Sequence, residues 1–166
     1  RQRQMCIRDS LAAVMVLCVS GLSLAAPSQV SQSRAAIAAA EAEIPASCNM
    51  IGYTEKDGIS SIVFQDTDTL EHYYVKVVAA TSKVKEIEVK GATFIKGSTI
   101  INKTPEEIIS FVEAEYLDAR DITVKLEKEG NNSYYKAQFK ADRFEGEMEF
   151  NPATGAIIER SLEYYL

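Results

Sequence analysis

Apolar and polar positions follow two different periods along this chain, and the pattern occurs twice. Each time, a hydroxyl residue precedes a segment with helical spacing, and stretches of alternating apolar and polar residues follow. The first copy extends from Ser31 to Glu86 and the second from Thr104 to Glu159, an offset of 73 residues. A period of this length predicts a tandem repeat of one supersecondary unit.

The second copy has the clearer helix signals. Thr104 is a good N-cap, Pro105 suits the first helical position, and Glu107 completes a capping box. Apolar residues then recur at helical spacing to about Leu117. In the first copy we expect Ser31 to cap an alanine-rich helix that ends before Pro45. Because alanine buries little area, we expect the first half to be the less stable one.

The strand stretches have one apolar and one polar face. This alternation predicts antiparallel sheet covered on one side only, with a turn at 151–155 in which Gly155 adopts a left-handed conformation. We therefore predict an α+β fold of two repeats, 26–90 and 104–166, joined by a connector at 91–103. Each repeat has one helix packed on a three- to four-stranded antiparallel sheet. The two sheets stand side by side or run together, and the pattern leaves this open.

The amino-terminal residues are set apart from the repeats. Residues 1–10 resemble a translated sequencing adapter, as found at broken ends of metagenomic assemblies, and carry no further argument. Residues 11–26 are apolar and end in small residues, and they are shorter than the roughly 20 residues that a membrane span needs. They are typical of the h-region of a signal peptide, at 11–25. We expect an exported bacterial protein with no stable membrane insertion after the signal is removed.

The charge of the chain excludes some classes of partner. The 18 basic and 24 acidic residues give a net charge of −6. Residues 1–25 hold three basic and one acidic residue, so the remainder has 15 basic and 23 acidic residues, a net charge of −8. Nucleic acids and anionic membranes bind basic patches, so neither is an expected partner. Beyond residue 25 the chain has one cysteine, Cys48, and one histidine, His72, and no cofactor is implied.

Two groups of acidic residues suggest sites. Glu145, Glu147 and Glu149 share one face of a strand, where Lys125, Lys136, Lys140 and Arg160 on neighbouring strands can pair with them. We interpret them as a solvated face with cross-strand ion pairs rather than as catalytic acids. The segment Asp66 to His72 matches no calcium loop and is interpreted as a turn.

Tyrosines occur as adjacent pairs, and one member of each strand pair faces away from the core. Tyr74 and Tyr134 are the best candidates for exposed contacts, since interfaces favour tyrosine. The candidate protein-binding face consists of Tyr74, Tyr134, Lys136, Glu145, Glu147 and Glu149. An uncovered sheet edge also makes a homodimer through the final strand, 157–165, conceivable.

The second copy resembles the PepSY domain family over residues 104–161. The resemblance rests on 104–108, on 134–139 and on the hairpin 147–157. The first copy, 31–89, is a degenerate match in which Ser82 stands where the family hairpin usually has glycine. The resemblance implies a secreted helix-on-sheet module of the kind that occurs in propeptides of thermolysin-type metalloproteases. It implies peptidase regulation, by binding or inhibiting a peptidase.

From these observations we expect a non-catalytic, exported protein-binding module whose partner is another extracytoplasmic protein, such as a peptidase. One alternative is a propeptide fragment of a thermolysin-type metalloprotease. Another is an extracytoplasmic module that senses a ligand or an ion. An enzyme is the weakest alternative, because the residues offer no catalytic triad and no nucleotide loop.

Overall fold

The computed structural model describes residues 29–92 and 96–166. The elements, in chain order, are α1 (Gln29–Glu41), β1 (Cys48–Lys56), β2 (Ile59–Asp66), β3 (His72–Val78), β4 (Lys83–Lys90), α2 (Pro105–Glu115), β5 (Arg120–Glu129), β6 (Asn132–Lys140), β7 (Phe144–Phe150) and β8 (Ile157–Tyr164). The predicted adapter and signal segments lie outside the described residues.

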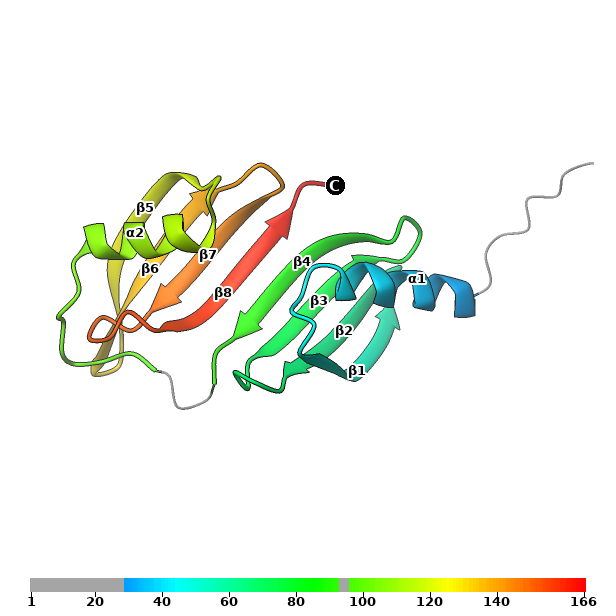
Figure 1. The fold of residues 1–166 in the computed structure, drawn as a ribbon, viewed down its shortest axis with the longest axis horizontal. Coiled ribbons are helices and arrows are strands. Elements are labelled where there is room, and N and C mark those ends of the chain that lie inside the picture. The colour runs from blue at the N-terminus through cyan, green and yellow to red at the C-terminus, as the bar shows by residue number, and fades with distance from the viewer. Residues whose placement is uncertain (1–28, 93–95) are drawn as a thin grey trace, which may run out of the picture.

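All eight strands form one antiparallel sheet in the order β1-β2-β3-β4-β8-β7-β6-β5 (Figure 1). The prediction of two repeats, each with one helix on its own three- to four-stranded sheet, is therefore wrong. The two halves join where β4 pairs with β8, Glu86–Lys90 opposite Glu159–Glu163. Each of these strands would otherwise end its own sheet with unpaired backbone groups, and their pairing satisfies both edges.

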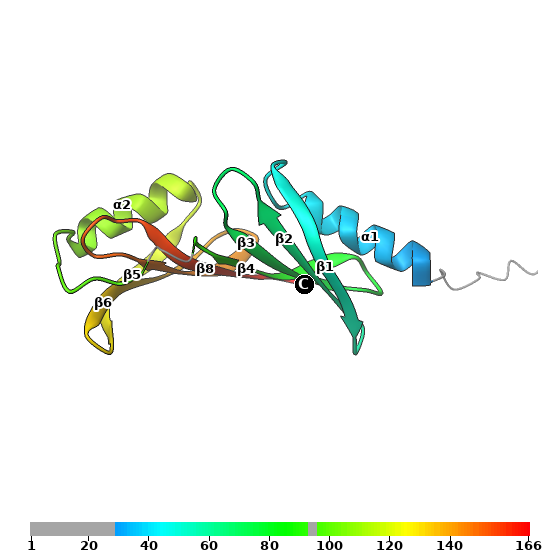
Figure 2. The ribbon, with the colours of Figure 1, turned by 90° about the horizontal axis from the view of Figure 1, so that it is seen from below.

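Both helices lie on the same side of this sheet (Figure 2). Helix α1 packs against β2, β3 and β4, whereas α2 packs against β5 and β6. Side chains of β2, β3, β6 and β7 alternate between buried and more exposed positions, as one covered face requires. We call the side without helices the open face.

The covered face holds two hydrophobic cores. In the amino-terminal half, Ala36 and Ala40 of α1 pack on strand residues that include Phe64. In the carboxy-terminal half, Ile108 and Val112 of α2 pack on strand residues of β6, β7 and β8. Both helices thus contribute side chains with no exposed surface, but those of α2 are larger.

Two turn residues show how the chain reverses direction between strands. Gly155 has φ of 80°, as predicted, and a Cβ there would lie 2.5 Å from the Phe111 ring. Ser82 has φ of 54°, so a serine adopts the left-handed conformation for which glycine is better suited.

The helix starts were predicted with mixed success. In α2 the capping box is confirmed: Glu107 N donates to Thr104 Oγ1 at 3.3 Å, and Thr104 N donates to Glu107 Oε2 at 2.9 Å. In α1 the prediction is wrong, because the helix begins at Gln29 and Ser31 lies inside it. The amphipathic pattern of the alanine-rich segment is weak, so its first turn was not marked by an apolar boundary.

The final strand does not form an edge. β8 lies in the middle of the sheet, between β4 and β7, and its backbone pairs on both sides. A homodimer through residues 157–165 is therefore excluded as predicted. The edge strands of the described sheet are β1 and β5.

Candidate binding face

The six residues of the predicted binding face occupy open-face positions on three strands. Tyr74 lies on β3, Tyr134 and Lys136 on β6, and the three glutamates on β7, each between residues that are buried on the covered face. The structure brings the β6 and β7 residues together, because Lys136 is opposite Glu149. Tyr74 lies apart from them. β4, β8 and β7 separate it from β6, a lateral distance of about 19 Å at the usual spacing between strands.

Seven glutamates gather at the centre of the open face, and we call them the acidic band. They are Glu86 and Glu88 on β4, Glu159 and Glu163 on β8, and Glu145, Glu147 and Glu149 on β7. Within the band, Glu163 has Glu86 on one side and Glu145 on the other, and Glu159 is opposite Glu149. Like charges placed directly opposite each other destabilise a sheet.

Sequence reasoning missed the four glutamates on β4 and β8. Their spacing two residues apart within each strand was visible and indicated one face per strand. It did not reveal that the two strands are neighbours. Only the pairing of β4 with β8 turns separate polar faces into one acidic band.

Lysines line both sides of the band and pair with four of its members. The pairs are Lys76–Glu86 at 2.9 Å, Lys90–Glu88 at 2.9 Å, Lys136–Glu147 at 2.6 Å and Lys140–Glu145 at 3.9 Å. Within the part of the chain that the structure describes, Glu149, Glu159 and Glu163 have no cation within 4.0 Å. The band therefore keeps a net negative charge. Arg160, which the sequence offered as a further partner, lies on the covered face instead.

The protonation of the band is not uniform. Burial, and then the charge of Glu159, raises the pKa of Glu149. Burial also raises the pKa of Glu159, where negative neighbours outweigh the attraction of Lys90. The pKa of Glu147 is lowered despite its burial, because Lys136 and Gln138 both donate hydrogen bonds to its carboxylate. The unpaired glutamates are thus the ones that ionise less readily.

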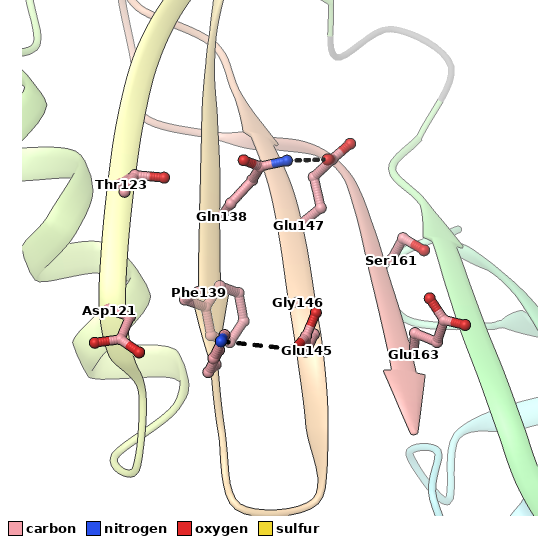
Figure 3. A pocket seen from close by; sticks show the side chains of 10 residues that line it. Asp121, Thr123, Gln138, Phe139, Glu145, Gly146, Glu147, Ser161 and Glu163 are labelled. Atoms are coloured by element: carbon pink, nitrogen blue, oxygen red, sulfur yellow. Dashed lines mark hydrogen bonds and ion pairs between the residues drawn. The ribbon is translucent and has the colours of Figure 1, made fainter. Parts of the chain in front are cut away.

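A shallow, polar hollow of about 520 Å³ lies beside the band (Figure 3). Four strands, β5 to β8, form it, and its polar side chains include Thr123, Gln138, Glu147, Ser161 and Glu163. Figure 3 shows these side chains on one side of the strands, without a second wall of protein above them. Such a surface fits contact with another macromolecule better than enclosure of a small molecule.

The two candidate tyrosines are held by neighbours rather than free. The Tyr134 hydroxyl donates to Glu127 at 3.0 Å, and this hydrogen bond raises the pKa of Tyr134. The Lys90 ammonium lies 5.7 Å from the centre of the Tyr74 ring. Both rings are partly exposed on the open face and have restricted orientations, which lowers the entropy lost on binding.

The Asp66 segment is a turn, as predicted. The buried Asp66 carboxylate accepts hydrogen bonds from Asp68 N at 2.7 Å, from Thr69 N at 3.2 Å and from Ser47 Oγ at 3.0 Å. These bonds lower the pKa of Asp66 against the effect of burial. In residues 29–92 and 96–166, no group of three or more histidine, cysteine, aspartate or glutamate residues is arranged to hold a metal ion.

Cys48 and His72 lie on different strands. Burial raises the pKa of the Cys48 thiol, and the charges of Asp66 and Glu71 raise it further. A raised pKa disfavours the thiolate that nucleophilic chemistry needs. His72 projects from β3 opposite Gln65 and Lys90.

On the covered face, Arg160 bridges the two halves. Its guanidinium donates to Glu115 at 2.5 Å and to the Tyr73 hydroxyl at 3.1 Å, and it lies 3.6 Å from Glu71. Glu71 and Tyr73 belong to the amino-terminal half, whereas Glu115 ends α2. Only 13% of the Arg160 side chain is exposed. A hydrogen-bonded charge at this depth links the two halves beyond the β4–β8 ladder.

Comparison of the chain with models of protein families, with curated proteins and with solved structures finds no match. The resemblance to the PepSY family therefore stays a prediction from the residues that carry it. Among the described helices, none is both long and apolar enough to cross a membrane.

Proposed function

We propose that this chain is a non-catalytic, exported protein-binding module that recognises its partner with the open face of the sheet. The observation that carries the proposal is the uncovered face itself. Eight strands present it without interruption, and both helices lie on the opposite side. A polar sheet face of this breadth offers many side chains in fixed positions, as recognition of a protein surface requires.

The charge on this face favours a particular kind of partner. The acidic band would attract a partner surface that carries lysine and arginine residues, and the flanking Lys76, Lys90, Lys136 and Lys140 would limit the orientations that it accepts. Tyr74 and Tyr134 would supply contact area on either side of the band. An extracytoplasmic peptidase remains the partner that the sequence resemblance suggests.

A charge reversal on the open face provides the test. Glu163→Lys changes an exposed glutamate that has no ion pair and has two glutamates opposite it, so the fold should tolerate the change. Glu113→Lys makes the same change of net charge at an exposed position on α2, on the opposite side of the molecule. The two variants thus differ only in the face that they alter.

The parent chain and both variants are used as bait in the extracellular fraction of the producing organism, with quantitative mass spectrometry. We expect the parent and Glu113→Lys to retain one peptidase in near-equal molar amount, and Glu163→Lys to lose it. Tyr134→Ala should weaken retention as well. Equal retention by all baits, or enrichment of no peptidase, contradicts the proposal. Raising the ionic strength should weaken a genuine complex, because salt screens exposed charges.

A further inference from the structure

The two edges of the sheet differ in how well they are protected from pairing with another strand. Six of the ten residues of β5 are charged, and α2 packs over this edge. β1 has charged side chains only at its end, Glu55 and Lys56, and its segment from Cys48 to Thr54 has none. Charged side chains and covering helices are the usual protection of an edge strand, so β1 is the less protected edge.

Apolar side chains also project from β1. Met50 is 47% exposed and Ile51 is 55% exposed. A bulge lies between them and Gly52: Met50 is opposite Phe64 and Gly52 is opposite Val63, which leaves Ile51 without a partner residue in β2. Helix α1 packs against β2, β3 and β4 rather than over this part of the sheet. Exposed apolar residues next to unpaired backbone groups are a template for strand addition.

We propose that the edge of β1 binds the same edge of a second copy of this chain, in antiparallel orientation, so that two copies share one sheet of sixteen strands. The absence of charge between Cys48 and Thr54 lets identical segments meet without repulsion. The open face does not allow this, because two acidic bands would repel each other. A second copy is therefore accepted at the edge and rejected at the face.

The chain already uses this kind of pairing within itself. β4 and β8 are the fourth strands of the two halves, and they pair antiparallel. In their ladder Glu88 is opposite Ser161, and these residues are separated by the same 73 positions that separate the two copies of the sequence pattern. Corresponding strands thus meet about a local two-fold axis. Pairing of β1 with β1 of a second copy repeats the arrangement between chains.

The arrangement has a consequence for the open face. Antiparallel neighbours are related by a two-fold axis perpendicular to the sheet, so the helices of both copies lie on one side. The two open faces then lie side by side and point the same way. The dimer presents two acidic bands on one surface, which gives bivalent contact with a partner that has two basic sites.

The mass of the full chain in solution tests the proposal. Sedimentation velocity is measured over a wide range of concentrations, with a reductant present so that Cys48 cannot link two chains. We expect a reversible species of twice the chain mass of 18.3 kDa. Ile51→Lys places lysines near each other across the two-fold axis, and it should raise the dissociation constant by more than about a hundredfold.

The matched control lies on the other edge. Leu126 of β5 is 42% exposed, so Leu126→Lys adds the same charge at a similar exposure and should leave the dimer intact. Circular dichroism checks that both variants keep the fold. A monomeric parent at every concentration overturns the proposal. So does a dimer that survives Ile51→Lys or that both substitutions disrupt equally, including one held by residues 11–26, which both variants keep. The outcome does not depend on the partner protein, so failure here is distinct from failure of the proposed function.

Discussion

The two halves of the sheet have the same order of elements but solve the packing of their helix differently. Helix α1 buries Ala36 and Ala40, whereas α2 buries Ile108 and Val112, and all four side chains have no exposed surface. Both helices begin at the same place relative to their strands, yet only α2 has a capping box. One architecture can therefore be built with a small or a large apolar helix face, at different stabilities.

The open faces of the halves differ even more. β3 presents His72, Tyr74 and Lys76 where β7, 73 residues later, presents three glutamates. The covered faces of the same strands keep apolar residues such as Val75 and Met148. The side chains that pack under a helix are thus restricted to one chemistry, and those on the open face are not. This is the difference expected where one face carries the fold and the other carries contacts.

Truncation of the helix cores should produce the largest effect. Ile108→Ala removes a fully buried side chain from α2 and should lower the free energy of unfolding by about 2–5 kcal/mol. Ile37→Ala makes the same change in α1 at a half-buried position and should cost less. Urea unfolding of both variants measures the difference. An equal loss would show that the two helices contribute alike, against the comparison drawn above.

Removal of the bridge between the halves comes next. Arg160→Met keeps the length of the side chain but leaves Glu71, Glu115 and the Tyr73 hydroxyl without its hydrogen bonds. We expect a loss of about 1–3 kcal/mol and unfolding of the halves at separate denaturant concentrations. Arg143→Met, at a side chain that is 65% exposed and pairs with Glu43, is the control and should change little. A single, unshifted transition in Arg160→Met would contradict the bridge.

The corresponding turns of the halves differ by one residue. Gly155→Ser should cost about 1–2 kcal/mol, because serine is strained at φ of 80° and its Cβ would approach Phe111. Ser82→Gly, at the position 73 residues earlier, should raise stability by less than about 1 kcal/mol, since glycine relieves strain but gains entropy in the unfolded chain. Thermal unfolding of the two exchanges tests both signs. Destabilisation by Ser82→Gly would show that the serine has a further role.

The pH dependence of the acidic band should be the smallest effect. The pKa values of Glu149 and Glu159 are raised above the ordinary 4.5 by burial and by their negative neighbours. The folded state therefore holds these protons more tightly than the unfolded chain. The stability that the two groups contribute is fully present below pH 4.5 and is lost as the pH rises through the raised values.

Replacing both residues by glutamine removes this loss. The Glu149→Gln/Glu159→Gln variant should be more stable than the parent at pH 7, and the difference should vanish on acidification below pH 4.5. Glu113→Gln on α2 removes a charge outside the band and controls for net charge. Urea unfolding at several pH values gives the comparison. A difference that grows as the pH falls would contradict the assigned direction of both pKa shifts.

The sequence by itself determined the features that depend on neighbours along the chain. Alternation placed Tyr74, Tyr134 and Glu147 on the polar side of their strands, because successive strand residues point to opposite faces. Thr104 and Glu107 marked the start of α2, and Gly155 marked a left-handed turn. Ser31 failed as a marker because a hydroxyl residue without a clear apolar boundary is ambiguous.

Only the tertiary structure decided which strands are neighbours. A two-residue period identifies the face of a strand, but both edges of a strand carry the same backbone donors and acceptors, so the sequence does not choose between partners. The pairing of β4 with β8 united the two halves in one sheet and moved the last strand from an edge to the centre. The same pairing assembled the acidic band from Glu86, Glu159 and their neighbours and left β1 and β5 as the edges.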